Sequence, residues 1–518
     1  MRRRTMIAVA TAATLTGALG AAQAASAATV QTHLDRLMVQ DGGSVVNRLT
    51  IQRVDGSENA RIRVRDTGHQ YPTAGPGCAV DPSDPRTVEC EGRDTVYVDT
   101  AGASDVVEID PALSGEVHGG SHDDLLVAGR ATWPESMAAH AADLAELAQD
   151  VSTVRWAGPF GSSTPPFASG IARAWQRGVD EAAAHPAPGV AASGPHAGDL
   201  ELEGGGNDDV VIGDDGPNRL SGGAGANLVI GGGGDDHLFA AETGVDTFVP
   251  GDGRDTLVGA ASSSATADYQ EVRTTLTADL AAGTVDDADG QPDTLVRVRG
   301  LLGGYGRNTI AGSTRSELLV GSSRNDTIDA RSGNDLIVGG PVHEGPSLPR
   351  LGGDRLIGGA AADAIVTETS DDVVIGGTQT TPVGGADDVV VYGGRTEDVT
   401  VDLATGEGGA AGEHDKLEGI SAVVGGSGDD VLRDSGTVER TRNLLDGAAG
   451  DDRLFAGNGG ADGVGDELFG GTGADVFDTT ADPGNRLASI IHCGADADAV
   501  TAKLIDQADA DCERVDRR

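Results

Sequence analysis

Three nine-residue stretches decide the fold: GGGGDDHLF at 231–239, GGSGDDVLR at 425–433 and GGTGADVFD at 470–478. Each matches the pattern GGxGxDxUx at every position, where U is a large apolar residue. Further units follow in the same phase, in contiguous runs at 213–239 and 303–338. Self-similarity at a fixed short period is typical of a solenoid, in which each unit packs only against its neighbours.

With this register, nineteen units are found between residues 119 and 478, among them one at 203–211 that places Val210 at the eighth position. The eighth position is apolar in every unit. Low-complexity disorder, which the Gly and acid content would otherwise suggest, does not place an apolar residue every nine positions. The sixth position is Asp in fifteen units: Asp124, Asp208, Asp236, Asp246, Asp255, Asp326, Asp335, Asp354, Asp363, Asp372, Asp388, Asp430, Asp452, Asp466 and Asp475. The other four units have Asn218, Asn227, Asn308 and Glu317 there.

The spacing of residues within a unit predicts a metal site. Glycines at positions one, two and four permit the positive φ angles of a tight turn and leave its carbonyl oxygens uncovered. The sixth-position Asp adds a carboxylate beside them, and hard oxygen ligands in a flexible turn favour Ca²⁺ over transition metals and Mg²⁺. Two units make a coil of eighteen residues, so that Asp326 stacks above Asn308, and stacked carboxylates repel unless a cation lies between them. The glycines expected to offer carbonyl ligands in the three full matches are Gly231, Gly234, Gly425, Gly428, Gly470 and Gly473.

These units resemble the RTX (haemolysin-type) calcium-binding repeats. The resemblance implies a parallel β-roll, with several Ca²⁺ ions held between successive turns by the sixth-position Asp and turn carbonyls. Units with Arg315, Arg324, Ala361, Ser370 or Ala386 at the fourth position depart from the pattern. The chain is also similar to secreted calcium-binding proteins of actinobacteria, including their cysteine pairs.

The N-terminal segment of the sequence indicates export. Residues 1–27 combine Arg2, Arg3 and Arg4, an apolar stretch and a small-residue cleavage site, which is typical of a signal peptide. The signal fits the Sec route, and the twin arginines also fit Tat export. The sequence therefore predicts a secreted, extracellular protein.

The four cysteines form two local pairs, Cys78 with Cys90 and Cys493 with Cys512. An even, paired set in an oxidising space favours disulfides. Four cysteines allow three connectivities, of which the short loops favour the local one.

Charge restricts the partners. The formal net charge is −45, which disfavours nucleic acid and anionic membranes and favours cations. No apolar run beyond the signal approaches the length of a membrane span, so we expect none.

Two further regions interrupt the nonads. Residues 269–304 and 392–426 repeat one another and predict β-hairpin extensions of the roll. Residues 130–200 hold Trp133, Trp156 and Trp175 in segments of helical spacing, which predict a small helical hairpin with a core of its own, followed by a linker. The predicted organisation is a signal peptide at 1–27, an N-terminal β region with a disulfide and the first nonad at 28–130, a helical insert at 131–200, a mostly β, RTX-like roll at 203–478 with hairpin modules at 269–304 and 392–426, and a disulfide-closed cap at 479–518.

Two classes of function follow. The first is a secreted, non-catalytic calcium-binding protein with an envelope, matrix or adhesion role, for which a polysaccharide of the envelope or matrix is a candidate partner. It is favoured because no HExxH, GxSxG or Walker motif occurs, and no catalytic residue is assigned. The second is a carbohydrate-active enzyme of polysaccharide lyase or epimerase type on a β-solenoid, which a pocket joining the tryptophans to acids and arginines would favour.

Overall fold

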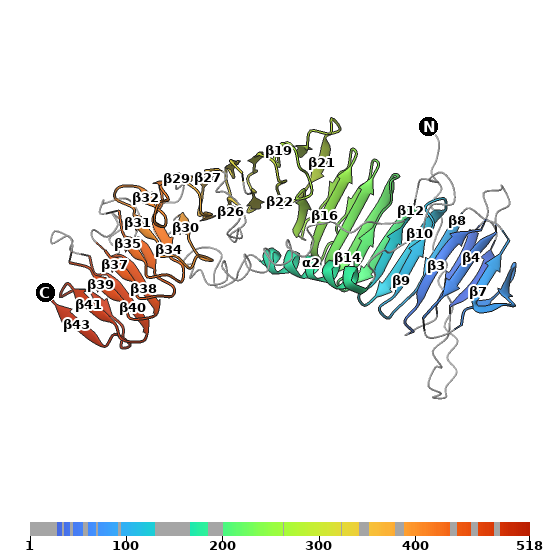
Figure 1. The fold of residues 1–518 in the computed structure, drawn as a ribbon, viewed down its shortest axis with the longest axis horizontal. Helices are drawn as coiled ribbons and strands as arrows, with labels where there is room; N and C mark the ends of the chain where they lie inside the picture. Colours follow the sequence, from blue (N-terminus) through green and yellow to red (C-terminus); the bar gives the residue numbers. More distant parts are fainter. Residues whose placement is uncertain are drawn as a thin grey trace.

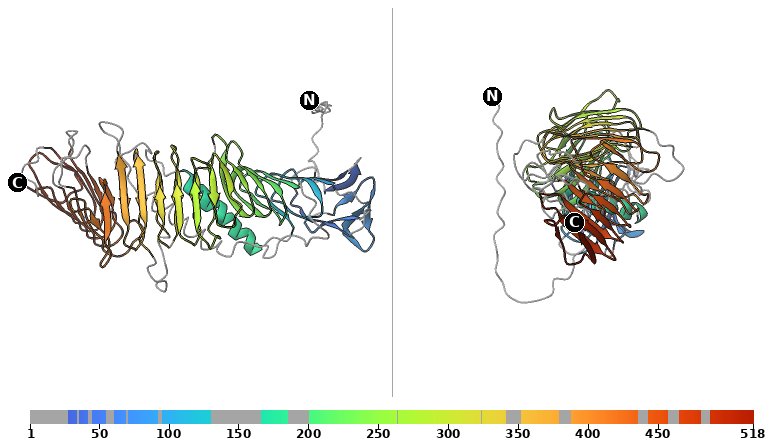
Figure 2. Two further views of the ribbon diagram at one scale, coloured as in Figure 1. Left: turned by 90° about the horizontal axis from the view of Figure 1, so that it is seen from above. Right: turned by 90° about the vertical axis from the view of Figure 1, so that its left-hand side faces the viewer.

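The fold is described from a computed structural model. It covers residues 28–33, 36–41, 45–54, 61–68, 71–91, 95–129, 166–184, 200–262, 264–322, 324–340, 352–378, 388–435, 443–456, 465–480 and 487–518. Within these ranges the chain is mostly β-structure and forms one elongated parallel solenoid (Figure 1). This confirms the predicted fold class. Short strands follow one another like rungs along the long axis (Figure 2).

Successive strands alternate between two faces of the solenoid, here named face A and face B. Each strand pairs in parallel with the strand one coil away, as Leu318–Val320 does with Leu336–Val338 on face B. Face A contains β10 (Ser114–Ser121), β12 (Leu200–Gly206), β15 (His237–Phe239), β17 (Thr256–Val258), β19 (Leu276–Asp279), β20 (Thr284–Asp286), β21 (Asp293–Val296), β23 (Asn308–Ala311), β25 (Thr327–Asp329), β27 (Arg355–Ala360), β29 (Val373–Thr378), β31 (Thr400–Asp402), β32 (Glu407–Gly408), β33 (Asp415–Glu418), β35 (Val431–Arg433), β37 (Arg453–Phe455), β39 (Val476–Asp478), β41 (Ala499–Ala502) and β43 (Arg514–Arg517). Face B contains β11 (Leu125–Ala128), β13 (Val210–Ile212), β16 (Gly244–Asp252), β18 (Ser264–Asp268), β22 (Gly300–Leu302), β24 (Leu318–Val320), β26 (Leu336–Val338), β28 (Ala364–Val366), β30 (Val389–Val391), β34 (Ala422–Val424), β36 (Leu444–Asp446), β38 (Glu467–Thr472), β40 (Ile490–Ala495) and β42 (Gln507–Ala508). Strand β14 (Asn218–Gly233) runs through both faces.

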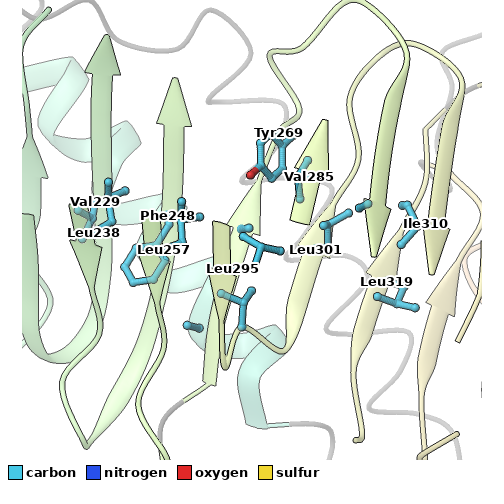
Figure 3. Close-up of a cluster of buried hydrophobic side chains, with 14 of the residues drawn as sticks. Val229, Leu238, Phe248, Leu257, Tyr269, Val285, Leu295, Leu301, Ile310 and Leu319 are labelled. Carbon is cyan, nitrogen blue, oxygen red and sulfur yellow. The ribbon is translucent and has the colours of Figure 1, made fainter. Parts of the chain in front are cut away.

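A column of apolar side chains fills the space between the faces. The middle residue of each short strand points inward, and Leu238, Phe248 and Leu257 show no exposed surface (Figure 3). The same column continues through Ile310 and Leu319. The eighth-position residues therefore form the core, because their period of nine brings one of them inward on each face of every coil.

The two segments that repeat one another insert antiparallel strands into face A. Strand β19 pairs antiparallel with β20, and β20 pairs antiparallel with β21. On their outer sides β21 and β19 pair in parallel with β17 and β23, so the parallel order resumes after the insertion. Strands β31, β32 and β33 repeat this arrangement between β35 and β29. Face B has no added strand at either insertion, because β18 pairs directly with β22 and β30 pairs directly with β34.

Face B is apolar on its outer side as well as its inner side. Many of its strands read as unbroken apolar triplets, namely β13, β24, β26, β28, β30 and β34, whereas face A strands such as RLF in β37 begin with a polar residue. Towards the C-terminus the pattern ends, since β36 (LLD) and β38 (ELFGGT) contain acids. Helix α2 (Pro166–Ala184) covers part of this outer side and packs on β13, β14 and β16. Ile171 and Ala174 of the helix join the outer apolar cluster.

The helix thus packs against the roll, whereas the sequence predicted a helical hairpin with its own core. Trp133, Trp156 and the helix expected around residues 137–151 lie outside the described residues, as does the side chain of Trp175.

Coils of the solenoid extend into both terminal regions. At the N-terminal end are β1 (Thr29–His33), β2 (Arg36–Gln40), β3 (Arg48–Arg53), β4 (Ile62–Asp66), β5 (Thr73–Ala74), β6 (Cys78–Asp81), β7 (Asp84–Cys90), β8 (Thr95–Asp99) and β9 (Val106–Ile109). The pairs β1–β2, β3–β4, β4–β7 and β6–β7 are antiparallel. The parallel coils begin with β2–β8 and β3–β9, and at the other end they extend to β41–β43. The roll is therefore longer than the predicted 203–478, because coils without the glycine signature continue the same pairing.

The structure pairs the cysteines as predicted. Cys78 bonds to Cys90 across the antiparallel strands β6 and β7, and Cys493 bonds to Cys512 in the last coils. No described cysteine is free. Each disulfide thus closes a short loop near one end of the solenoid.

Candidate calcium sites

The sixth-position acids stack into continuous ladders along the edges of the solenoid. In each step the backbone N–H of one residue donates to the Oδ1 atom of the residue one coil further on, as Asp236 does to Asp255 at 2.8 Å. Steps of this kind run through Asn47, Asp105, Asp124, Asp209 and Asn227; through Asn218, Asp236, Asp255 and Asp293; through Asn308, Asp326, Asp354, Asp372 and Asp415; through Glu317, Asp335, Asp363 and Asp388; and through Asp430, Asp452, Asp475 and Asp498. The Asp498 N–H in turn donates to Glu513 Oε2.

The second oxygen of most of these carboxylates is buried without a hydrogen-bond partner. Buried carboxylates are normally compensated by hydrogen bonds, opposite charges or metal ions, because removing them from water is costly. A whole row of unsatisfied oxygens therefore calls for a common partner. The Oδ2 atoms in this state belong to Asp105, Asp124, Asp209, Asp236, Asp246, Asp255, Asp335, Asp354, Asp363, Asp372, Asp452, Asp466, Asp475 and Asp498.

These oxygens converge with carbonyl oxygens at the first glycine of each turn. A Cβ atom built on Gly119 would lie 2.6 Å from both Asp124 Oδ2 and the carbonyl oxygen of Gly204 in the next coil. The corresponding point at Gly204 lies 2.6 Å from both Asp209 Oδ2 and the Gly222 oxygen. Only glycine fits, since real Cβ atoms do not approach other atoms so closely. Each such turn therefore brings a carboxylate oxygen and a backbone oxygen from the next coil to one point.

Glycines at different positions of the turn have different roles. Gly232 and Gly234, at positions two and four, have φ angles of 103° and 98°, which favour glycine. Gly231, at position one, is required for space, because a Cβ there would contact Asp236 Oδ2 and the Pro250 carbonyl oxygen. The prediction of a positive φ angle at all three positions is therefore wrong for position one, where glycine is needed for space.

The predicted glycine ligands divide between two rows. Gly470 offers its carbonyl oxygen beside Asp452 Oδ2, at the position of Gly447. The carbonyl oxygens of Gly234 and Gly428 instead face Gly253 and Gly450, the fourth-position glycines of the next coils. First-position carbonyls thus lie with the carboxylates, while these fourth-position carbonyls form a neighbouring row.

Asparagine satisfies the same position without an ion. The Asn308 side-chain amide donates to the carbonyl oxygens of Gly304 at 3.0 Å and Gly306 at 3.2 Å. Asn227 likewise donates to the Gly223 oxygen at 3.2 Å and to Asp246 Oδ1 at 2.7 Å. An amide group therefore supplies to the turn the positive partner that a carboxylate lacks.

The hairpin modules use a tyrosine for the same purpose. Tyr269 donates its hydroxyl hydrogen to Asp293 Oδ2 at 2.8 Å, and Tyr392 does so to Asp415 Oδ2 at 2.8 Å. Both tyrosines are buried. Because these hydroxyls occupy the Oδ2 atoms, the two carboxylates need no further partner.

Burial raises the pKa of the unsatisfied carboxyls. Desolvation is the largest cause in each case and raises the pKa of Asp124 to about 8, of Asp209 to about 9 and of Asp452 to about 8. Without a cation, these groups therefore favour their protonated form near neutral pH. A divalent cation beside them reverses this preference, because it stabilises the carboxylate.

The structure places one predicted acid off the ladder. Asp208 is partly exposed, and its neighbour Asp209 is fully buried in the ladder. Strand β13 points Val211 inward, so the unit begins at Gly204 and the predicted register at 203–211 is wrong by one residue. The sequence DDVVI allows both registers, because three apolar residues follow two acids. The other fourteen predicted acids are all buried.

Sequence reasoning missed ladder residues in coils that lack glycine turns. Asp105 and Asp498 belong to the ladders and have unsatisfied Oδ2 atoms. Each lies two residues before an inward apolar residue, Val107 and Val500 respectively. This shorter D-x-U pattern is the signal that could have found them.

The geometry defines a parallel β-solenoid with oxygen-rich turns between its coils. The family model of the RTX calcium-binding nonapeptide repeat matches the chain in four copies, at residues 203–238, 311–341, 351–380 and 440–460. The chain thus contains RTX calcium-binding nonapeptide repeats, as the sequence predicted. A search among curated proteins gives no match.

The donor set fits the calcium ion that such repeats bind. The partnerless oxygens are carboxylates, and the atoms converging on them are backbone carbonyl oxygens, which are the hard ligands that Ca²⁺ takes. In the part of the chain that the structure describes, no helix has the length and hydropathy needed to cross a membrane.

Proposed function

We propose that this protein is a secreted, non-catalytic calcium-binding protein whose solenoid is completed by Ca²⁺ outside the cell. The observation that carries the proposal is the row of buried, partnerless Oδ2 atoms that meet turn carbonyls. The signal-like N-terminus, the two disulfides and the net charge of −45 support an extracellular setting, where calcium is abundant. An envelope or matrix role, with polysaccharide as partner, stays a prediction.

The mechanism follows from the ladder. In each coil Oδ1 is held by the preceding coil's N–H, which fixes the carboxylate so that Oδ2 faces the turn carbonyls. Asp236, Asp363, Asp452 and Asp475 would hold Ca²⁺ in this way, and the ion would supply the positive charge that these oxygens lack. Because calcium binds the ordered turn and not the loose chain, its binding free energy adds to the stability of the fold.

A calcium titration tests the proposal. The mature chain from residue 28, first treated with a chelator, is followed by far-UV circular dichroism while calcium is added. We expect a cooperative gain of β signal or of thermal stability with calcium, and little with equimolar magnesium. A chain whose spectrum and stability are the same in chelator, magnesium and calcium would contradict the proposal.

A further inference from the structure

One unit departs from the repeat in a way that adds a third carboxylate to a pair of ladder acids. Residues 367–375 read TETSDDVVI, so Glu368 stands at the second position, where the repeat has glycine. Glu368 lies between β28 and β29, and its side chain is turned inward, with the residue 7% exposed. A long acidic side chain thus enters the turn region that other units leave to backbone.

Glu368 meets Asp354 and Asp372 in the interior of the roll. One oxygen from each of the three carboxylates lies within 4.8 Å of the other two. Asp354 precedes β27 and Asp372 precedes β29, and these strands are parallel neighbours on face A. The three side chains therefore converge from two adjacent coils on one point.

Two of these carboxylates have an oxygen without any hydrogen-bond partner. Asp354 Oδ1 accepts the Asp326 N–H at 2.7 Å, and Asp372 Oδ1 accepts the Asp354 N–H at 2.8 Å. Asp354 Oδ2 and Asp372 Oδ2 receive no hydrogen bond, although the residues are only 2% and 0% exposed. Ser370 contributes its single hydroxyl to Glu368 Oε1 and Asp372 Oδ1. Ser370 is thus a neutral donor to Glu368 and Asp372, and it leaves the Oδ2 atoms of Asp354 and Asp372 without a hydrogen bond.

The nearby buried cation is already neutralised. Arg395 donates to the Glu368 backbone carbonyl and to Thr367 Oγ1, and its charge pairs with Glu413 at 2.6 Å. Both side chains of that ion pair are almost fully buried, at 2% and 0% exposed. Arg395 therefore positions the segment that carries Glu368, while its charge is paired with Glu413.

Two glycines without side chains, Gly339 and Gly340, leave space that the carboxylates of the cluster occupy. A Cβ built on Gly340 would lie 2.6 Å from Glu368 Oε2, and one built on Gly339 would lie 2.7 Å from Asp354 Oδ2. Any other residue type at these two positions would press on the carboxylate oxygens. The two glycines thus line the side of the cluster that faces the preceding coil.

We propose that Asp354, Glu368 and Asp372 form a separate calcium site, built from three side-chain carboxylates instead of one carboxylate and turn carbonyls. Oxygen-only ligands of charge −3 select a hard cation of high charge, and affinity for Ca²⁺ rises with the number of charged ligands. This site therefore fills at lower free calcium than the glycine turns. The inference shares Asp354 and Asp372 with the proposed turn sites, but it depends on Glu368, which no turn site uses.

The test counts bound calcium. The full mature chain and its Glu368→Gln variant are chelated, dialysed against a series of free calcium concentrations at pH 7.5 and analysed for metal content. We expect the wild type to bind its first ion at a concentration at which E368Q binds none, and the affinity of that first site to fall more than tenfold. The glutamine keeps the shape and the acceptor for Ser370, and E368G, which restores the repeat's glycine, is a second variant with the same expected loss.

Two controls separate this site from the turns. Glu397→Gln removes the same charge from an exposed position and should bind like the wild type. Asp452→Asn should lose a turn site and keep the first ion. If the wild type, E368Q and E368G bind the same number of calcium ions at every free calcium concentration, including no ions at all, the inference is overturned. A first ion lost only in E368Q and E368G, with no later ions in the wild type, would support the inference and refute the proposed calcium turns.

Discussion

Replacing Asp452 by Asn changes one side-chain atom at a point where the surroundings are well defined. Asp452 is fully buried, its Oδ1 accepts the Asp430 N–H at 2.8 Å and its Oδ2 has no partner. An asparagine keeps the Oδ1 acceptor and places an NH₂ group at Oδ2. By analogy with Asn308, that group would donate to the carbonyl of Ala448, the second residue of the same turn.

The variant should have opposite effects on the calcium-free and calcium-bound protein. In chelator it removes a buried, unsatisfied acceptor and gains a hydrogen bond, which together raise the free energy of unfolding by about 1–3 kcal/mol. In calcium at one hundred times the dissociation constant, each bound ion contributes about 2.7 kcal/mol. Asn offers no charge to the ion, so the stabilisation that calcium adds should fall by about this amount.

Urea unfolding followed by circular dichroism, in chelator and in saturating calcium, measures both effects. Asp451→Asn is the matched control, because it removes the same charge from the exposed neighbouring residue and should leave both values near those of the wild type. A D452N protein that is less stable in chelator, or that gains as much from calcium as the wild type, would refute the assignment of Oδ2 as the calcium-facing atom.

Three further predictions concern the same buried groups. In chelator, the free energy of unfolding should fall as the pH rises from about 5 to 9. Burial raises the pKa of Asp475 to about 6 and of Asp209 to about 9, so the folded state binds more protons than the unfolded state over this range. A free energy of unfolding that rises over this range would contradict the prediction. Tyr392→Phe leaves Asp415 Oδ2 buried without its donor and should cost about 1–3 kcal/mol in urea unfolding, equally in calcium and in chelator, and a loss seen only in chelator would show that an ion replaces the hydroxyl. Arg395→Met leaves Glu413 buried without its partner and should cost about 3–5 kcal/mol, of which Glu413→Leu in the same chain should restore a part, since the bonds from Arg395 to Thr367 and to the Glu368 carbonyl stay lost; a double variant as unstable as the single one would show that the unpaired Glu413 charge is not a source of the loss.

Much of this architecture follows from the period of nine. An apolar residue at the eighth position of each nine-residue unit places one inward side chain in each strand. The internal repeat around Asp293 and Asp415 locates both hairpins. The partners along each ladder could not be predicted from spacing alone. Asp326 donates to Asp354 across 28 residues and Asp372 to Asp415 across 43, because insertions between coils change the interval of eighteen.

Two features depended on signals outside the nonad pattern. The apolar outer side of face B is encoded by triplets such as LIV and VVV. In these triplets an aliphatic residue stands where a face A strand such as RLF begins with a polar one. The turns before Asp105 and Asp498 lack the glycines of the first and fourth positions but keep an Asp two residues before an inward apolar residue. In both cases the glycines, which dominate the repeat in sequence, carry no information about the feature.

The two hairpin insertions also determine the curvature of the molecule. Each adds two strands to face A and none to face B, so face A is longer by about 10 Å at each insertion, given a strand spacing of about 4.8 Å. A solenoid whose faces differ in length must bow toward the shorter one, and Figure 1 shows an arch with β19 and β21 near its crest. Removing one hairpin would therefore shorten the chain and yet move the two ends of the molecule further apart.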